Sequence, residues 1–483
     1  MFFQFEERPK TAATIMEDET QKLSLKREVG LMGAVSLIGG TMIGSGIFMS
    51  PQTVLATIGS PGASLVVWAS CGLLVLLASF CHAEMGTVIR ESGGEYIYIL
   101  RTSGPVIAFM LIFSSVLFAR PASVVGISLS FAQYVVAPFY SDCAPPVALV
   151  KCVAAAAIIT LATVNCLNVR FSMSVQVFFM LAKVLSLAVI IVAGTVMLIR
   201  GHTENLQDSF ENSNIGISPI GIAFYQGLWA YDGWNNLNYV TEELKRPEVN
   251  LPRAVIIAIS LVTGLYLLVN VSYLTVLTPK ELISSNAVAV TWGNKVFGSW
   301  GWIMSLAAAL SAFGSLNGTF FSGGRVCLVA AREGHLPDVL SMAHVHRLTP
   351  SPALIFTTVV SLLVLIPGDF QGIVNFFSFT AWFFYAITLA GLIYLKIKKP
   401  ELPRPYKVPI ILPIVVLIAA VFLVLAPIID DPQIEYLYVT LFIFSGVLIY
   451  IPFIHYKLFP SLLTKLTIFL QLFLQVAPAE KNL

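Results

Sequence analysis

The sequence predicts an all-α protein with about twelve transmembrane helices. Hydrophobic residues make up 57% of the 483-residue chain and charged residues only 11%, whereas a soluble protein of this length needs far more charge to cover its surface. Apolar stretches long enough to cross a bilayer core as a helix, roughly 20 residues, recur between residues 31 and 457. Because these stretches are continuously apolar, they favour helices over the alternating strands of a barrel.

Twelve spans account for the apolar stretches, with Gly, Pro, Asn and Ser at the connections. The expected spans are residues 31–53, 64–88, 104–137, 147–165, 171–199, 216–241, 253–277, 299–330, 351–367, 373–397, 408–428 and 434–457. They form one membrane domain at 31–457, between an N-terminal tail at 1–30 and a C-terminal tail at 458–483. The N-terminal tail is polar and is not expected to be a cleavable signal peptide.

Lysine and arginine are distributed unevenly between the two sides of the predicted membrane domain. Of the 28 such residues, 21 lie in tails and connections on the N-terminal side. The opposite side has four: Lys151, Arg200, Lys280 and Lys295. Cytoplasmic loops of membrane proteins carry the excess of positive charge, so both termini are predicted to be cytoplasmic. The net charge of +2 is too small to indicate nucleic-acid binding.

Two of the spans are interrupted at their centres. The first contains the run GGTMIGSG at residues 39–46, and each glycine weakens a helix by about 1 kcal/mol against alanine. Close packing of small residues explains this run equally well when it is taken alone. The span 216–241 is interrupted by WAYDGWNN at residues 229–236. Interrupted helices at matching places in two halves of a chain indicate a transporter binding site.

An interrupted helix has the groups that bind an α-amino acid. The break leaves backbone N–H groups free at the start of the second half and carbonyl groups free at the end of the first. The N–H groups, with the positive end of the helix dipole, attract a carboxylate, and the carbonyl groups attract an ammonium. A zwitterionic amino acid carries both.

Several motifs resemble those of a known family. They are GTMIGSGIF at 40–48, WAYDGWN at 229–235, VTEE at 240–243 and AREGHLP at 331–337. In this order and spacing they resemble the light subunits of heteromeric amino acid transporters, within the amino acid–polyamine–organocation superfamily. The resemblance covers most of residues 25–480 and is greatest for the broad neutral-and-cationic (b-zero-plus) type.

The resemblance implies a fold and a mode of transport. The fold has two inverted repeats of five helices, expected at 31–199 and 216–397, followed by two additional helices at 408–457. The implied activity is obligatory amino acid exchange across the plasma membrane without sodium and without a cofactor. The implied partner is a single-span type II glycoprotein heavy chain.

The resemblance also gives the expected substrate-binding residues. They are Met42, Ile43, Gly44, Ser45, Gly46, Trp229, Ala230, Asp232, Asn235 and Asn236. Trp229 is expected to act as a lid over the substrate, although a buried aromatic residue is more often simple packing. Asn236 stands where a glutamine is expected in the b-zero-plus type, so the pocket differs from that type.

Three charged residues inside the spans have expected roles. Asp232 is expected to meet a cationic substrate side chain, because a buried charge near a binding site is commonly functional. The alternative is a structural pair with Arg120 or Lys183. Lys183 is expected to replace the sodium ion of related transporters, with snorkelling to the membrane surface as the alternative. Arg120 is expected to be a structural or gating charge. Glu84 and Arg325 are expected to join packing networks near the cytoplasmic face.

Cys143 lies in a short polar loop on the predicted extracellular side, where disulfides persist. It matches the family position that bonds to the heavy chain. An internal bridge to Cys152 is the alternative. No His or Cys cluster has the spacing of a metal site.

Other functions remain as alternatives. The spans contain no metalloprotease motif or nucleophile–base signature of a membrane enzyme and no repeated filter of a channel. Among transporters, the nearest alternative is a preference for aromatic or large neutral amino acids.

Overall fold

The computed structural model describes residues 25–140, 143–368, 370–429 and 432–479. The α-helices in chain order are α2 (Leu31–Met42), α3 (Gly46–Ile58), α4 (Pro61–Val88), α5 (Glu95–Ser103), α6 (Pro105–Ser114), α7 (Arg120–Val136), α8 (Val147–Leu167), α9 (Val169–Ile199), α10 (Ile217–Ala230), α11 (Pro247–Val276), α12 (Pro279–Ser284), α13 (Val288–Phe297), α14 (Trp302–Arg332), α15 (Ser351–Leu365), α16 (Phe370–Lys398), α17 (Ile411–Ile429), α18 (Ile434–Ile449) and α19 (Pro460–Leu474).

Short elements of other kinds connect these helices. The π-helical segments are η1 (Ser115–Ala119) and η7 (Tyr450–His455). The 3₁₀ segments are η2 (Ala137–Phe139), η3 (Glu204–Leu206), η4 (Asn236–Glu243), η5 (Gly298–Trp300) and η6 (Asp338–Ser341). The strands β1 (Met342–His344) and β2 (Val476–Pro478) pair antiparallel.

The predicted all-α membrane fold is confirmed. Within the described residues, nine helices are long and apolar enough to cross a membrane, and the bent pair α2 and α3 makes a tenth. The two remaining expected spans correspond to α10 with η4 and to the shorter apolar helix α15. The third expected span, 104–137, is one path through α6, η1 and α7, with a π-helical segment immediately before Arg120.

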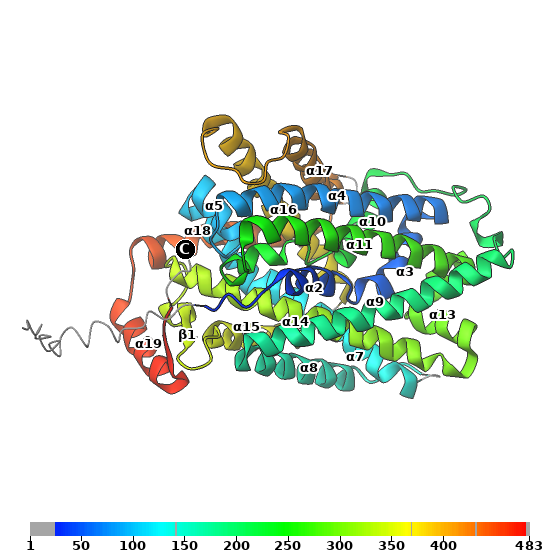
Figure 1. The fold of residues 1–483 in the computed structure, drawn as a ribbon, viewed down its shortest axis with the longest axis horizontal. Coiled ribbons are helices and arrows are strands. Elements are labelled where there is room, and N and C mark those ends of the chain that lie inside the picture. Colours follow the sequence, from blue (N-terminus) through cyan, green and yellow to red (C-terminus); the bar gives the residue numbers. More distant parts are fainter. Residues whose placement is uncertain (1–24, 141–142, 369, 430–431, 480–483) are drawn as a thin grey trace, which may run out of the picture.

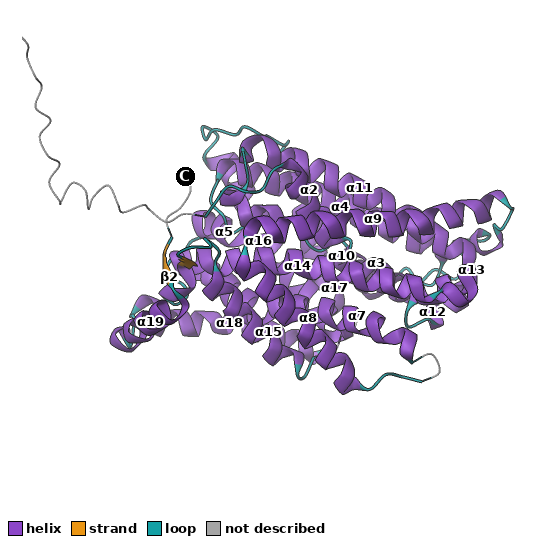
Figure 2. Cartoon of the chain, turned by 60° about the horizontal axis from the view of Figure 1, so that its bottom comes forward, coloured by secondary structure: helices purple, strands orange, loops and turns teal. Residues whose placement is uncertain are grey.

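The helices form an elongated bundle in which α14 is central. Figure 1 shows the main helices running along the long axis, with α19 and β1 at one end and α13 at the other; Figure 2 shows the same helices from a second side. Helix α14 packs against α2, α7, α9 and α15. In its most apolar stretch 72% of the residues are buried inside the bundle, whereas only 11% are buried in the span at Ile434–His455. Glycine, serine and alanine let neighbouring helices approach α14 closely.

Ion pairs join helices at the end of the bundle that is predicted to face the cytoplasm. Arg325 on α14 binds Glu243 on η4 through two hydrogen bonds, of 2.5 and 3.0 Å, and both side chains are at most 1% exposed. Arg332 pairs with Glu242 at 2.8 Å, which brings the motifs at 240–243 and 331–337 into contact. Glu84 on α4 likewise contacts Lys396 at 2.9 Å and Arg404 at 3.2 Å.

The C-terminal segment is more ordered than the expected tail at 458–483. It contains α19, and β2 pairs with β1 in the connection after α14. The sequence analysis missed the helix because its apolar residues, which include Leu462, Leu466, Phe469 and Leu472, form a run shorter than a membrane span. The N-terminal tail at 1–24 and residues 480–483 lie outside the described residues.

Replacing Arg325 with Gln is expected to destabilise the bundle strongly. The change leaves the Glu243 carboxylate buried without its counter-charge, which costs about 3–5 kcal/mol. Thermal unfolding of the purified protein in detergent measures this effect. The exposed Arg347, changed in the same way, serves as the matched control. Equal melting temperatures for the two variants would contradict the importance of the buried pair.

Candidate functional site

The first span is interrupted where the sequence predicts it. Helix α2 ends at Met42, helix α3 begins at Gly46, and the two axes are bent by 41°. Ile43 has φ −75° and ψ 84°, outside the helical region. Ser45 precedes α3 without a side-chain cap. Its carbonyl oxygen accepts from the N–H groups of Phe48 and Met49, so the N–H groups of Gly46 and Ile47 are left for another acceptor.

The sixth span is interrupted as well. Helix α10 ends at Ala230, the next five residues form turns, and the chain continues as the 3₁₀ segment η4. Gly233 has φ 101°, a conformation that strongly favours glycine over other residues. The sequence analysis located this break correctly but did not foresee that the second half is a short 3₁₀ segment.

The two interruptions are pressed against each other. A Cβ atom added to Gly46 would lie 2.4 Å from the Cα atom of Ala230, so the backbone of span 1 meets the backbone of span 6 without room for a side chain. A small hollow lies at this junction. Five of the expected substrate-binding residues line it together with Asp232: Met42, Gly44, Ser45, Gly46 and Trp229.

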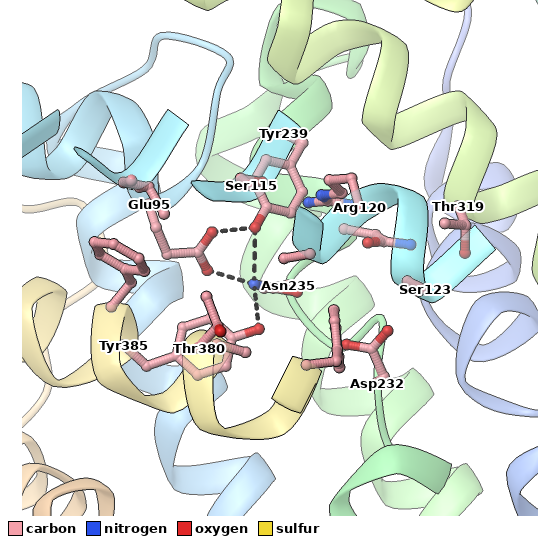
Figure 3. Close-up of a pocket in the computed structure, with 16 residues that line it drawn as sticks. Glu95, Ser115, Arg120, Ser123, Asp232, Asn235, Tyr239, Thr319, Thr380 and Tyr385 are labelled. Atoms are coloured by element: carbon pink, nitrogen blue, oxygen red, sulfur yellow. Dashed lines mark hydrogen bonds between the residues drawn. The ribbon is translucent and has the colours of Figure 1, made fainter. Parts of the chain in front are cut away.

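A larger cavity lies beside the first (Figure 3). Asp232 lines both cavities. Asn235 and Asn236 from span 6 and Arg120 and Ser123 from α7 also line the larger one. Asn236 Nδ2 is buried and has no hydrogen-bond partner among the described residues, so one donor in the wall remains available to a ligand.

Side chains from other helices hold the carbonyl groups at the breaks. The Tyr266 hydroxyl on α11 lies 2.5 Å from the Met42 carbonyl oxygen and 2.6 Å from that of Ala230. Ser315 on α14 donates to Thr41 at 2.5 Å, and Ser311 lies 3.1 Å from the Ile43 carbonyl oxygen. The sequence analysis treated these carbonyl groups as free and missed Tyr266, Ser311 and Ser315.

Charges of both signs line the larger cavity. Arg120 lies over the Tyr239 ring, with Cζ 4.2 Å from its centroid, and donates to Ser322 at 3.3 Å. Among the described residues, no salt bridge within 4.0 Å joins Arg120 to Asp232. Asp232 therefore makes no direct ion pair with Arg120, although the two charges act on each other, and Asp232 lines the cavity (Figure 3).

Glu95 is a cavity residue that the sequence analysis missed. It lies at the start of α5 and lines the larger cavity. Asn235 and Tyr239 donate hydrogen bonds to its carboxylate (Figure 3). His82 lies 3.1 Å away on α4. The available signal was a glutamate that follows two glycines and precedes a tyrosine-rich segment. Its position between two expected spans is, however, also typical of an exposed loop residue.

Lys183 lies between span 1 and span 8, buried within the bundle. Its ammonium donates to the Gly40 carbonyl oxygen, and a Cβ atom added to Gly314 on α14 would lie 2.9 Å from Nζ. The side chain is 1% exposed, which contradicts snorkelling to the surface.

Trp229 separates the smaller cavity from an aromatic cluster. Its ring contacts Phe377 and Phe370 edge-on, with centroids 5.5 and 6.0 Å apart. It is 5% exposed, so packing and proximity to the cavity coexist at this residue.

All six cysteines lie among the described residues and none is bridged. Cys143 and Cys152 are both exposed, and the internal bridge between them is not formed. Among the residues that the structure describes, no group of His, Cys, Asp or Glu is arranged to hold a metal ion.

Two interrupted helices that meet at a charged cavity within a bundle of apolar helices define a polytopic membrane protein with the core of a transporter. The chain matches the family described as amino acid permease over residues 29–453. It belongs to this family.

Curated relatives match over nearly the whole chain. The human b(0,+)-type amino acid transporter 1 is 48% identical over 97% of both chains. The human cystine/glutamate transporter is 40% identical over 96% of this chain and 93% of its own length. The mouse large neutral amino acids transporter small subunit 2 is 43% identical over 85% of this chain and 78% of its own.

Replacing Gly46 with Ala is expected to abolish substrate binding, because the added Cβ must push span 6 away from span 1. Binding of labelled leucine to the purified protein measures the effect. Gly264→Ala on α11 is the matched control, since nothing lies within 4 Å of its added Cβ. Unchanged binding by the Gly46 variant would show that the junction is not the site.

Proposed function

We propose that this protein is a sodium-independent exchanger of neutral and cationic L-amino acids. The observation that carries the proposal is the junction of two helix breaks, with Asp232 lining both cavities there. The backbone N–H groups of α3 bind the substrate carboxylate, and the carbonyl groups at Met42 and Ala230 bind its ammonium. The names of the relatives, which include a b(0,+)-type amino acid transporter, support this function.

The side chain of the substrate extends into the larger cavity. Phe377, Phe384 and Tyr385 give that cavity an apolar wall, which suits leucine or phenylalanine. Asp232 supplies a counter-charge for arginine or lysine. The second candidate function is transport of large neutral amino acids alone. The aromatic wall and the relative of that name support it. It gives the Asp232 carboxylate, however, no cationic side chain to bind.

Transport by alternating access follows from the arrangement of the breaks. The inverted repeats at 31–199 and 216–397 place one interrupted helix in each half, with the helices at 408–457 outside them. Movement of spans 1 and 6 against α14 opens the site to one side at a time. The ion pairs Arg325–Glu243 and Arg332–Glu242 then separate when the cytoplasmic side opens. The proposed exchanger lies in the plasma membrane with both termini in the cytoplasm, and the excess of lysine and arginine on that side supports this orientation.

The protein acts as the light subunit of a heterodimer with a type II membrane glycoprotein. An exposed, unbridged Cys143 near the predicted extracellular end supports this pairing, as does the relative named a small subunit. No cofactor is required by the proposed mechanism, and no catalytic chemistry is assigned.

Exchange is expected to be independent of sodium, because the Lys183 ammonium already supplies a positive charge to the Gly40 carbonyl oxygen. Uptake of labelled leucine into preloaded proteoliposomes should be unchanged when choline replaces sodium. Lys183→Ala should lower uptake in both media. Strict dependence of the unmodified protein on sodium would contradict this role.

Asp232→Asn is expected to weaken uptake of arginine and lysine far more than uptake of leucine. The variant keeps the size of the side chain but removes its charge, and one charge-assisted contact is worth about 1.5–3 kcal/mol, which shifts selectivity by roughly ten-fold or more. Competition by unlabelled amino acids in proteoliposomes measures the ratio. Equal loss for both substrate classes, at the same amount of inserted protein, would make Asp232 structural.

Cys143→Ser is expected to abolish a high-mass complex on non-reducing gels when the chain is expressed with its heavy chain. Cys152→Ser is the matched control, because Cys152 is also exposed and unbridged. It should leave the complex intact. The reverse pattern would assign the link to Cys152.

A further inference from the structure

A buried histidine lies behind a buried glutamate that lines the larger cavity. His82 lies on α4 and Glu95 begins α5. His82 Nε2 is 3.1 Å from Glu95 Oε1, and the two side chains are 2% and 3% exposed. The other ring nitrogen, Nδ1, is 3.0 Å from the Ala78 carbonyl oxygen. Both nitrogens of the ring therefore lie close to oxygen atoms, although Nε2 forms no aligned hydrogen bond.

This proximity favours an additional proton on the pair. A carbonyl oxygen can only accept a hydrogen bond, so Nδ1 carries the hydrogen that points at Ala78. In a neutral imidazole Nε2 then has a lone pair, and it would face the lone pairs of the Glu95 carboxylate. The repulsion disappears when one proton is held by the pair, either on the imidazole ring or on the carboxyl group.

The other partners of Glu95 do not provide that proton. Asn235 Nδ2 and the Tyr239 hydroxyl both donate to the carboxylate. They use one acceptor position on each oxygen and point no hydrogen at His82 Nε2. They also connect the pair directly to span 6, because Asn235 lies in its unwound segment and Tyr239 lies on η4.

Apart from Asp232, the other groups around the pair do not change their charge near neutral pH. Tyr98, Tyr239 and Tyr385 surround the pair and stay neutral, since a phenol ordinarily ionises near pH 10. The Trp234 ring packs edge-on against His82 at 4.6 Å. Arg120 on α7 lines the same cavity and stays positive. Asp232 also lines the cavity, so the experiment must separate its response from that of the pair.

We propose that His82 and Glu95 form a proton-binding site in the wall of the substrate cavity, and that the bound proton sets the preference of the site for neutral or cationic side chains. This inference rests on the proposed function. With the proton bound, the pair carries no net charge. When the proton leaves to the solvent through the cavity, the pair carries one negative charge, which attracts a cationic side chain in addition to Asp232. Binding is reciprocal, so a cationic substrate favours release of the proton.

Exchange at different external pH tests the site. Uptake of labelled arginine and labelled leucine is measured into preloaded proteoliposomes between about pH 5.5 and 7.5, a range in which histidine titrates. The guanidinium of arginine keeps its charge throughout, and any change at the α-amino group is common to both substrates. In the unmodified protein, the ratio of arginine to leucine uptake should rise about threefold or more with pH, as expected for one added charge near the substrate.

Each of two variants fixes the charge of the pair at one value. His82→Gln keeps a donor toward Glu95 without titration, so the ratio should be high and constant across the range. Glu95→Gln removes the negative charge, so the ratio should be low and constant. Asp232 is unchanged in both, so a response that arises from Asp232 would persist in them and overturn the inference. If one variant does not fold, the other still decides.

His335→Gln is the matched control. His335 is also buried, and its ring contacts α5 through the Tyr96 hydroxyl at 2.7 Å, next to Glu95. It should keep the pH response of the unmodified protein. Loss of the response in this control would assign it to the packing of α5 and overturn the inference, as would a ratio that does not change with pH in the unmodified protein. Absence of any arginine or leucine exchange in the unmodified protein would instead refute the proposed function.

Discussion

The contact between the two helix breaks is the constraint on which the rest of the structure depends. Gly46 and Ala230 bring the backbones of span 1 and span 6 together with no side chain between them. This approach leaves main-chain groups as the lining of the smaller cavity. Tyr266, Ser311 and Ser315 hold the freed carbonyl groups, so α11 and α14 stabilise a conformation that neither broken helix would keep alone.

The charges of the cavity depend on the same junction. Because α10 unwinds after Ala230, Asp232, Asn235 and Asn236 turn into the space that α5, α7 and α16 enclose. Arg120 follows a π-helical segment in the third span, and such segments are frequent at functional sites. Irregular backbone therefore occurs where it lines a cavity, in agreement with the requirement that backbone groups in a membrane find partners within the protein.

Sequence patterns predicted the spans and both breaks well, because these depend on local composition. Long apolar runs and clustered glycines are visible within one segment of chain, and so is an aspartate inside such a run. The partners that complete the site are not local. Glu95 reaches the cavity from a connection between spans, and Tyr266 is one of several tyrosines in otherwise apolar helices. Their roles depend on which helices pack together. The contact between Arg332 and Glu242 joins two motifs that the sequence analysis had treated only as signatures of a family.

The hydroxyl of Tyr266 has a further consequence. It has a single hydrogen and stands within 2.6 Å of two acceptors, the carbonyl oxygens of Met42 and Ala230. One hydrogen cannot form a full bond with both. The Met42 carbonyl oxygen also accepts from the Gly44 N–H at 2.9 Å, so the Ala230 carbonyl can take the Tyr266 hydrogen without leaving Met42 unpaired. Each carbonyl oxygen has two lone pairs and each charged amino group three hydrogens, so a primary ammonium is the kind of group that can share these two oxygens with the protein donors.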